Sequence, residues 1–447
     1  KFGSMRQVSE KLAARIGLEN LARTAGYPDP VRLEWAMEAR AVADLAQGPK
    51  TIKVGEVKVS LAIGDLGEPQ LTITRGGKPL KSIPAGIKKD PRVVELVGRK
   101  REVEQQKSRM RQSLELAMCR GDTFTGAELQ TLLDHPVLAP MLEQLVFLGD
   151  GLAGYPVKRG KALEAHDGTR RPVRANTVLR IAHPHDLLTT GEWHLWQREC
   201  FVHERIQPFK QVFRELYVVT PAEKAEGAIS HRYAGHQVNP RQAFALLTSR
   251  GWVTVPEEGV RRTFHDEGLS ARLTCLNGAF TPAEVEGLTI EGAAFTRPGE
   301  WKPLNLCDVP PRVFSEVMRD VDLVVSVAHR GGVDPEASAS TVEMRAALVR
   351  ETCTLLKIDN VRLNGAHALV DGQLGHYSVH LGSAVVHRQP GGALCIVPVH
   401  SQHRGRLFLP FADDDPKTAE VTSKILLLAR DNEIKDPTIL EQILATH

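Results

Sequence analysis

Polar and aromatic side chains that could hold an anionic ligand gather in the middle of the chain. They occupy two stretches, Gln207 to Tyr217 and His231 to Gln237, in which basic residues alternate with aromatic ones. Arginine beside aromatic rings can bind an anion, and histidine can move a proton near neutral pH. The candidate polar site comprises Lys210, Arg214, Glu215, Arg232, His236, Arg319 and Asp320. A structural network in which such residues pair internally explains them equally well, so both interpretations stay open.

Sequence signatures of the common catalytic classes are missing. The chain has no G-x-x-x-x-G-K-[ST] loop, no G-x-G-x-x-G after a strand, no H-E-x-x-H and no G-x-S-x-G, which argues against the common NTPase, dinucleotide-binding and hydrolase classes. The run from His183 to Asp186 contains two histidines and a carboxylate, but zinc would need further ligands from elsewhere. A turn into a helix is the favoured interpretation. No metal or cofactor is expected, and no catalytic residue is assigned.

A second candidate site is a basic segment, Lys88 to Arg111, within a helix predicted over 88–118. It carries nine Lys or Arg against four acids. The residues that could bind a nucleic-acid backbone are Arg99, Lys100, Arg101, Lys107, Arg109 and Arg111. Because no aromatic residue interleaves these charges and acids are available for pairing, a solvated helix is the favoured interpretation.

The stretch from Val309 to Ala328 must position Arg319 and Asp320. Two prolines followed by apolar residues at helical spacing predict a helix, and the apolar run from Leu323 to Val327 predicts a buried strand. Arg319 and Asp320 are therefore expected at a helix-to-strand corner, as a solvated turn or as part of a site. A helix over 341–357 and a strand over 361–370 would complete a crossover with a parallel strand pair.

The length indicates several domains, and the predicted helices and strands indicate a mixed α and β (α+β) protein. The 447 residues are 42% hydrophobic and 25% charged, with a net charge of +3. Six scattered cysteines without a C-x-x-C pair, and no apolar run near the roughly 18 residues of a membrane span, favour the cytoplasm. Residues 1–5 are interpreted as a cloning remnant, which hints at a longer protein. The predicted regions are 6–150, helical with a β-meander over 51–80; 151–300, β-rich with helices; and 301–447, an α/β unit with a mixed sheet.

Several blocks in order resemble the MolR-type bacterial family. They are QPFKQVFRELYVVTPAE, RYAGHQ, RQAFALL, RGW, VPPRVFSEVMRDVDLVVSVA, HYSVHLGSAVV, LCIVPV and LPFADDD followed by SKILLLA. Proteins of this family carry a large domain of unknown function, often with a WGR domain or helical repeats. The resemblance implies a genomic association with MoxR-type AAA+ ATPases and von Willebrand A domain proteins. It implies no reaction, and this chain has no WGR domain.

A second pattern resembles poly-ADP-ribosyltransferases. It consists of His380, Leu381, Gly382 and Ser383, then Phe411, Ala412 and Asp413, then Ser423 and Lys424. Leu381 interrupts the H-G-S motif, and alternation along a strand would send His380 and Leu381 to opposite faces. Only Glu420, Glu433 and Glu441 follow as candidates for a catalytic glutamate.

Three hypotheses remain from the sequence. The first is a scaffold or adaptor of a bacterial stress-response or conflict system, acting through protein contacts with the AAA+ and von Willebrand A domain partners. The second is an enzyme acting on a nucleotide or nucleic acid, a distant ADP-ribosyltransferase among the options. The third is a nucleic-acid-binding module that uses the basic helix. No membrane partner is expected.

Overall fold

The computed structural model describes residues 8–27, 29–255, 259–265, 267–276, 287–330, 337–396 and 407–445. Helices and strands are mixed along them, which confirms the α+β prediction. The chain forms two compact units. The N-terminal unit contains the residues up to His183 together with Gln207–Gln211, and the C-terminal unit contains Pro184–Ile206 and the chain from Val212 onward. The predicted remnant at residues 1–5 lies outside the described residues.

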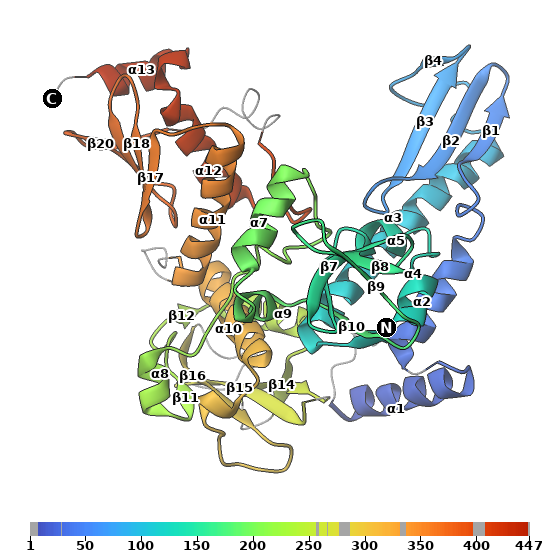
Figure 1. The fold of residues 1–447 in the computed structure, drawn as a ribbon, viewed down its shortest axis with the longest axis horizontal. Helices are drawn as coiled ribbons and strands as arrows, with labels where there is room; N and C mark the ends of the chain where they lie inside the picture. The colour runs from blue at the N-terminus through green and yellow to red at the C-terminus, as the bar shows by residue number, and fades with distance from the viewer. Residues whose placement is uncertain are drawn as a thin grey trace. The chain divides into compact units, whose positions relative to one another are not determined.

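The N-terminal unit opens with two helices and a four-stranded meander (Figure 1). These elements are α1 (Val8–Thr24), α2 (Pro30–Ala41), β1 (Lys50–Val54), β2 (Val57–Ile63), β3 (Pro69–Arg75) and β4 (Lys78–Pro79). The strand order is β1-β2-β3-β4, and each pair is antiparallel. The β-meander predicted over 51–80 is therefore confirmed.

Helix α3 (Pro91–Arg120) is the long helix predicted from the basic segment. It begins where Asp90 accepts a hydrogen bond from the backbone N–H of Arg92, and it ends at Gly121, whose φ of 74° suits a left-handed cap. Val93, Leu96 and Val103 belong to its buried face, at the spacing of an amphipathic helix. An apolar stripe of α3 therefore faces the core.

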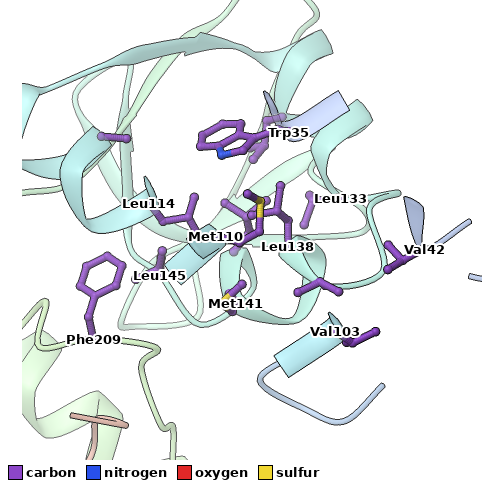
Figure 2. Packing of buried hydrophobic residues seen from close by; sticks show 14 of the residues in the cluster. Trp35, Val42, Val103, Met110, Leu114, Leu133, Leu138, Met141, Leu145 and Phe209 are labelled. Atoms are coloured by element: carbon purple, nitrogen blue, oxygen red, sulfur yellow. The ribbon is translucent and has the colours of Figure 1, made fainter. Parts of the chain in front are cut away.

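The rest of the N-terminal unit is a six-stranded sheet with two short helices. These elements are β5 (Thr123–Thr125), α4 (Gly126–Leu132), α5 (Leu138–Leu142), β6 (Phe147–Gly149), β7 (Leu152–Val157), β8 (Ala162–Glu164), β9 (Arg170–Pro172) and β10 (Val178–Ile181). The strand order is β5-β10-β6-β7-β8-β9. Figure 2 shows the core of this unit, in which Trp35 lies near Met110 of α3 and Leu138 of α5, and Phe209 comes from the segment Gln207–Gln211.

The first half of the C-terminal unit surrounds a second antiparallel sheet. Its elements are α6 (Pro184–Thr189), α7 (Trp193–Val202), α8 (Pro221–Glu226), β11 (Ile229–Ser230), β12 (Gln237–Val238), α9 (Pro240–Ser249), β13 (Val253–Val255), β14 (Gly259–Phe264), β15 (Leu269–Cys275), β16 (Leu288–Thr296) and η2 (Leu306–Asp308). The strand order is β11-β16-β15-β14-β13, and β12 also pairs with β16. Its core includes Phe295 of β16 and Phe314 from the following helix, whose ring centroids are 6.0 Å apart.

Helix α10 (Pro311–Ala328) is one uninterrupted helix, so the strand predicted over Leu323 to Val327 is wrong. The helical spacing continues to the end, because Val321, Val325 and Ala328 are all buried. Val327 is 55% exposed, which fits the outer side of a helix and contradicts a strand covered on both faces. A short β-branched run inside a buried helix looks like a strand when it is read alone.

The second half of the C-terminal unit contains an antiparallel sheet, so the predicted parallel strand pair and mixed sheet are wrong. Its elements are α11 (Ala339–Leu355), β17 (Val361–Asn364), β18 (His367–Asp371), β19 (His376–His380), β20 (Val386–Gln389), β21 (Ala393–Leu394), α12 (Pro416–Ala429), η3 (Asp431–Glu433) and α13 (Pro437–Leu444). The described sheet has the order β17-β18-β19-β20-β21 and is antiparallel throughout. The single strand predicted over 361–370 is a hairpin that turns at Gly365 and Ala366, the former with a φ of 54°.

Candidate functional site

Helix α10 gathers most of the candidate polar residues of the C-terminal unit. Its buried charged residues include Glu316, Asp320 and Asp322, and Arg319 stands among them. Arg319 and Asp320 therefore lie inside a helix, and the predicted helix-to-strand corner does not exist. Charges in such a place need partners, because an unpaired charge in a protein interior is costly.

Arg214 and Glu316 form a buried ion pair. The Nε of Arg214 donates to Oε1 of Glu316 at 2.8 Å, and its Nη2 donates to Oε2 at 2.7 Å. Each side chain is 3% exposed. This two-bond geometry is the strong form of an arginine–carboxylate contact, and it fixes the segment around Arg214 against α10.

The residues that follow Arg214 continue along the same helix. The Nε of Arg319 donates to Oε2 of Glu215 at 2.9 Å, and the backbone N–H of Tyr217 donates to Oγ of Ser315 at 3.1 Å. Arg214 and Glu215 therefore both pair within the protein, as the structural-network interpretation of the sequence predicts. They do not pair with each other, because each has its partner on α10. The segment 214–217 is held in register by hydrogen bonds to this helix.

Asp320 binds three side chains from the sheet side of α10. Its Oδ2 accepts from Nε1 of Trp252 at 2.8 Å and from Nη1 of Arg262 at 2.6 Å. Nε of Arg250 lies 3.3 Å from its Oδ1. Two cations and an indole N–H surround one carboxylate, so Asp320 ties α10 to the region between α9 and β14.

Asp322, which is not among the candidate residues of the polar site, is the centre of a buried hydroxyl cluster. The Tyr217 hydroxyl donates to its Oδ2 at 2.7 Å, and the Ser338 hydroxyl donates to the same atom at 3.2 Å. Burial raises the pKa of the Asp322 carboxyl, although these hydrogen bonds favour its ionised form. Burial, with Asp322 nearby, also raises the pKa of Tyr217. Ser338 is the N-cap of α11, so the cluster links α10 to the next helix.

The remaining candidates of the polar site lie elsewhere. Arg232 pairs with Glu223 at 2.5 Å, and its guanidinium stands 5.8 Å from the ring centroid of Phe314 on α10. The ring of His236 is 6.4 Å from the ring of Tyr233. Lys210 is buried in the N-terminal unit. Arg319 and Asp320 therefore lie on α10, Arg214 and Glu215 bind to it, and Arg232 lies beside it. Lys210 belongs to the other unit.

Most basic residues of α3 are also partnered within their unit. Arg99 contacts Asp44 at 3.0 Å, Lys100 contacts Glu104 at 2.5 Å and Arg109 contacts Glu38 at 2.6 Å. Nε of Arg111 donates to the carbonyl of Pro208 at 2.7 Å. Arg101 is exposed and Lys107 is half-buried, and neither has an ion-pair partner among the described residues. The geometry agrees with the solvated, self-paired helix.

The two motifs with possible ligand chemistry serve local structure. Pro184, His185 and Asp186 form the first turn of α6, so the helix begins three residues earlier than the predicted turn into Leu187. At the end of β19, Nδ1 of His380 lies 2.9 Å from Oγ of Ser383, which closes a tight turn. The carbonyl of Leu381 accepts from Arg345 at 2.9 Å. Among the described residues no group of three or more His, Cys, Asp or Glu is arranged to hold a metal ion.

Glutamates downstream of His380 have different surroundings. Glu420 contacts Lys424 at 2.8 Å, and Lys424 also donates to the carbonyl of Ala384 at 2.9 Å. Glu433 lies in η3 and Glu441 in α13. Glu420 is therefore tied to the turn after β19 through a lysine, which holds α12 against the sheet.

Three stretches of the chain match domain families of unknown function. A family of unknown function, DUF5724, matches residues 1–37; a domain of unknown function, DUF4132, matches residues 77–252; and another, DUF7737, matches residues 342–443. Helix α10 lies between the second and third matches. Comparisons with curated proteins and with solved structures find no match. No helix in the described ranges is both long and apolar enough to cross a membrane.

Proposed function

We propose that the chain is a scaffold or adaptor in the cytoplasm of a bacterium, within a stress-response or conflict system. The observation that carries this proposal is the pairing around α10. Arg214 with Glu316, Arg319 with Glu215, and Asp320 with Arg262 are ion pairs inside the fold. Charges held in this way fix a framework, whereas a general acid or base must reach a substrate. The resemblance to MolR-type proteins supplies the expected partners, a MoxR-type AAA+ ATPase and a von Willebrand A domain protein.

A scaffold needs exposed side chains that can anchor a partner. Trp301, in the loop after β16, is 73% exposed. Tryptophan is enriched among the residues that dominate binding energy at interfaces, because it buries a large area at little conformational cost. We assign Trp301 as one contact to a protein partner.

The proposal is tested by measuring complex formation between the purified chain and each purified partner encoded beside its gene. We expect a complex by size-exclusion chromatography and biolayer interferometry, and we expect Trp301→Ala to weaken it by about tenfold or more. The matched control is Val202→Ala, which removes an apolar side chain that is 61% exposed at the end of α7. Substrate turnover by the purified chain alone, or the absence of any complex, contradicts the proposal.

A further inference from the structure

A cluster of basic side chains in the N-terminal unit belongs neither to α3 nor to the polar network around α10. We call it the basic hairpin patch; it consists of Lys158, Arg159, Lys161, Arg171 and Arg174. All five side chains are exposed. Between residues 158 and 174 the chain has six Lys or Arg against two acids, Glu164 and Asp167, which leaves a local excess of four positive charges.

The patch differs from α3 because its charges are not neutralised from within. The sixth basic residue, Arg170, pairs with Glu164. None of the five patch residues forms an ion pair with a residue that the structure describes. Unpaired cations gathered on one surface attract an anionic partner.

The backbone of the turn between β7 and β8 gives an independent reason to assign a role to two of these residues. Lys158 has a φ of 52° and Arg159 a φ of 55°, followed by Gly160 at 73°. This left-handed region is usually occupied by glycine, asparagine or aspartate, because other side chains are strained there. A lysine and an arginine in such positions act against local stability, which indicates that their side chains are required for something else.

The turn and the edge strand β9 present their cations at the same end of the sheet. The backbone N–H of Val173 donates to the carbonyl of Lys161 at 2.9 Å, and Ala162 pairs with Pro172 across β8 and β9. Arg171 and Arg174, on either side of Val173, therefore continue the charge of the turn. The five cations are thus divided between the turn before β8 and the region of β9, the strand that follows β8.

Beside the edge strand lies a hollow of about 170 Å³. Leu152, Leu163 and Leu179 belong to its apolar lining, and its charged lining consists of two cations, Arg171 and Arg174, and one acid, Asp150. Drug-sized ligands commonly occupy about 300–1,000 Å³, so this hollow suits one small ring system. An apolar surface beside arginines can accept an unstacked base, while the arginines hold its phosphate.

We propose that the basic hairpin patch binds single-stranded nucleic acid, with the phosphate backbone running from Lys158 toward Arg174 and one base resting in the hollow. Several phosphates in a row match the spread of the cations. An anionic lipid surface would favour large apolar side chains among the cations, and the exposed residues of this hairpin region are basic, acidic or small.

The test measures fluorescence anisotropy of a labelled single-stranded 20-nucleotide DNA of mixed sequence, titrated with the full chain at several salt concentrations. The first variant, Lys158→Asn with Arg159→Gly, removes two charges and installs the residues that a left-handed turn prefers. We expect the affinity to fall by about tenfold or more, and the slope of log K against log salt to flatten by about 1.4, as the loss of two phosphate contacts requires. The melting temperature should stay the same or rise.

A second variant, Arg171→Gln with Arg174→Gln, should weaken binding similarly without touching the turn. The matched control is Lys53→Gln with Lys58→Gln, two exposed lysines of the β1–β2 hairpin in the same unit, which should leave the affinity within about twofold. The proposal is overturned if the full chain does not bind the oligonucleotide, or if the control weakens binding as much as the patch variants do. Binding to vesicles of 70% phosphatidylcholine and 30% phosphatidylglycerol without binding to the oligonucleotide also overturns it.

Discussion

Helices α3 and α10 are both rich in charge, but they place their ion pairs in different surroundings. On α3, Arg109 is 48% exposed where it meets Glu38 of α2, so water and salt reach the pair. On α10, Glu316 and Arg214 are each 3% exposed. Exposed pairs contribute little to stability, whereas removing one partner of a buried pair leaves an uncompensated charge in the interior. Burial therefore decides how much an arginine–glutamate pair matters for stability, even though the two pairs consist of the same residue types.

The largest effect is expected from breaking the buried pair. Glu316→Ala should lower the free energy of unfolding of the C-terminal unit by about 3–5 kcal/mol, because the Arg214 guanidinium stays buried without its carboxylate. Urea denaturation followed by circular dichroism measures this. Glu343→Ala removes an exposed acid from α11 of the same unit and serves as the control. A loss below about 1 kcal/mol would show that the pair is not a structural element.

A smaller loss is expected at the neighbouring carboxylate. Asp320→Asn keeps an oxygen that can accept from Trp252, but it removes the charge that faces Arg262 and Arg250. Hydrogen bonds to charged groups contribute about 1.5–3 kcal/mol, and we expect a loss in that range by the same denaturation measurement. An unchanged midpoint would mean that the sheet and α10 do not depend on this contact.

Asp322, on the same helix, should make the free energy of unfolding depend on pH. Its pKa is raised by burial, so between the ordinary carboxyl value near 3.9 and its value in the fold, the folded state binds more protons than the unfolded state. Its contribution to stability must therefore fall as pH rises through this interval. Asp322→Asn should remove that part of the pH dependence, measured as the difference in unfolding free energy between the two proteins from pH 4 to 7. A difference that does not change with pH would refute the raised pKa.

The smallest effect is expected on α3. Arg109→Ala breaks the exposed contact with Glu38, and the expected loss is about 0.2–1 kcal/mol, smaller still in 0.5 M salt because exposed charges are screened. Thermal unfolding at low and high salt measures it. A loss as large as that of Glu316→Ala would erase the contrast between the two helices.

Local signals in the sequence predicted the local structure well. The alternation in β1 to β3 and the apolar stripe of α3 gave a meander and a long helix that the structure confirms. The turn at Gly365 and Ala366 was missed although the dipeptide Asn364-Gly365 at its start is a turn signal, so one strand was predicted where the structure has a hairpin. The run from Leu323 to Val327 was misread because strand-like residues sit within a buried helix.

The candidate site was predictable in its residue types and not in its partners. Arg214 and Glu215 were recognised as candidate residues in an aromatic stretch, yet Arg214 meets its partner Glu316 across a separation of 102 residues. Asp322 was not chosen as a site residue, because its place beside the run predicted as a strand suggested a solvated turn, whereas the helix continues through it. For the basic hairpin patch a signal did exist in the density of Lys and Arg between residues 158 and 174.

The central claim, that the charges around α10 form a framework, is tested most directly by a double-mutant cycle on Arg214 and Glu316. The cycle compares Arg214→Met, Glu316→Leu and the double variant with the original chain, all by denaturant unfolding. We predict that each single change is strongly destabilising and that the double variant lies within about 1–2 kcal/mol of the original, because apolar residues of similar volume can replace a buried pair. Two small single effects that simply add would contradict the account.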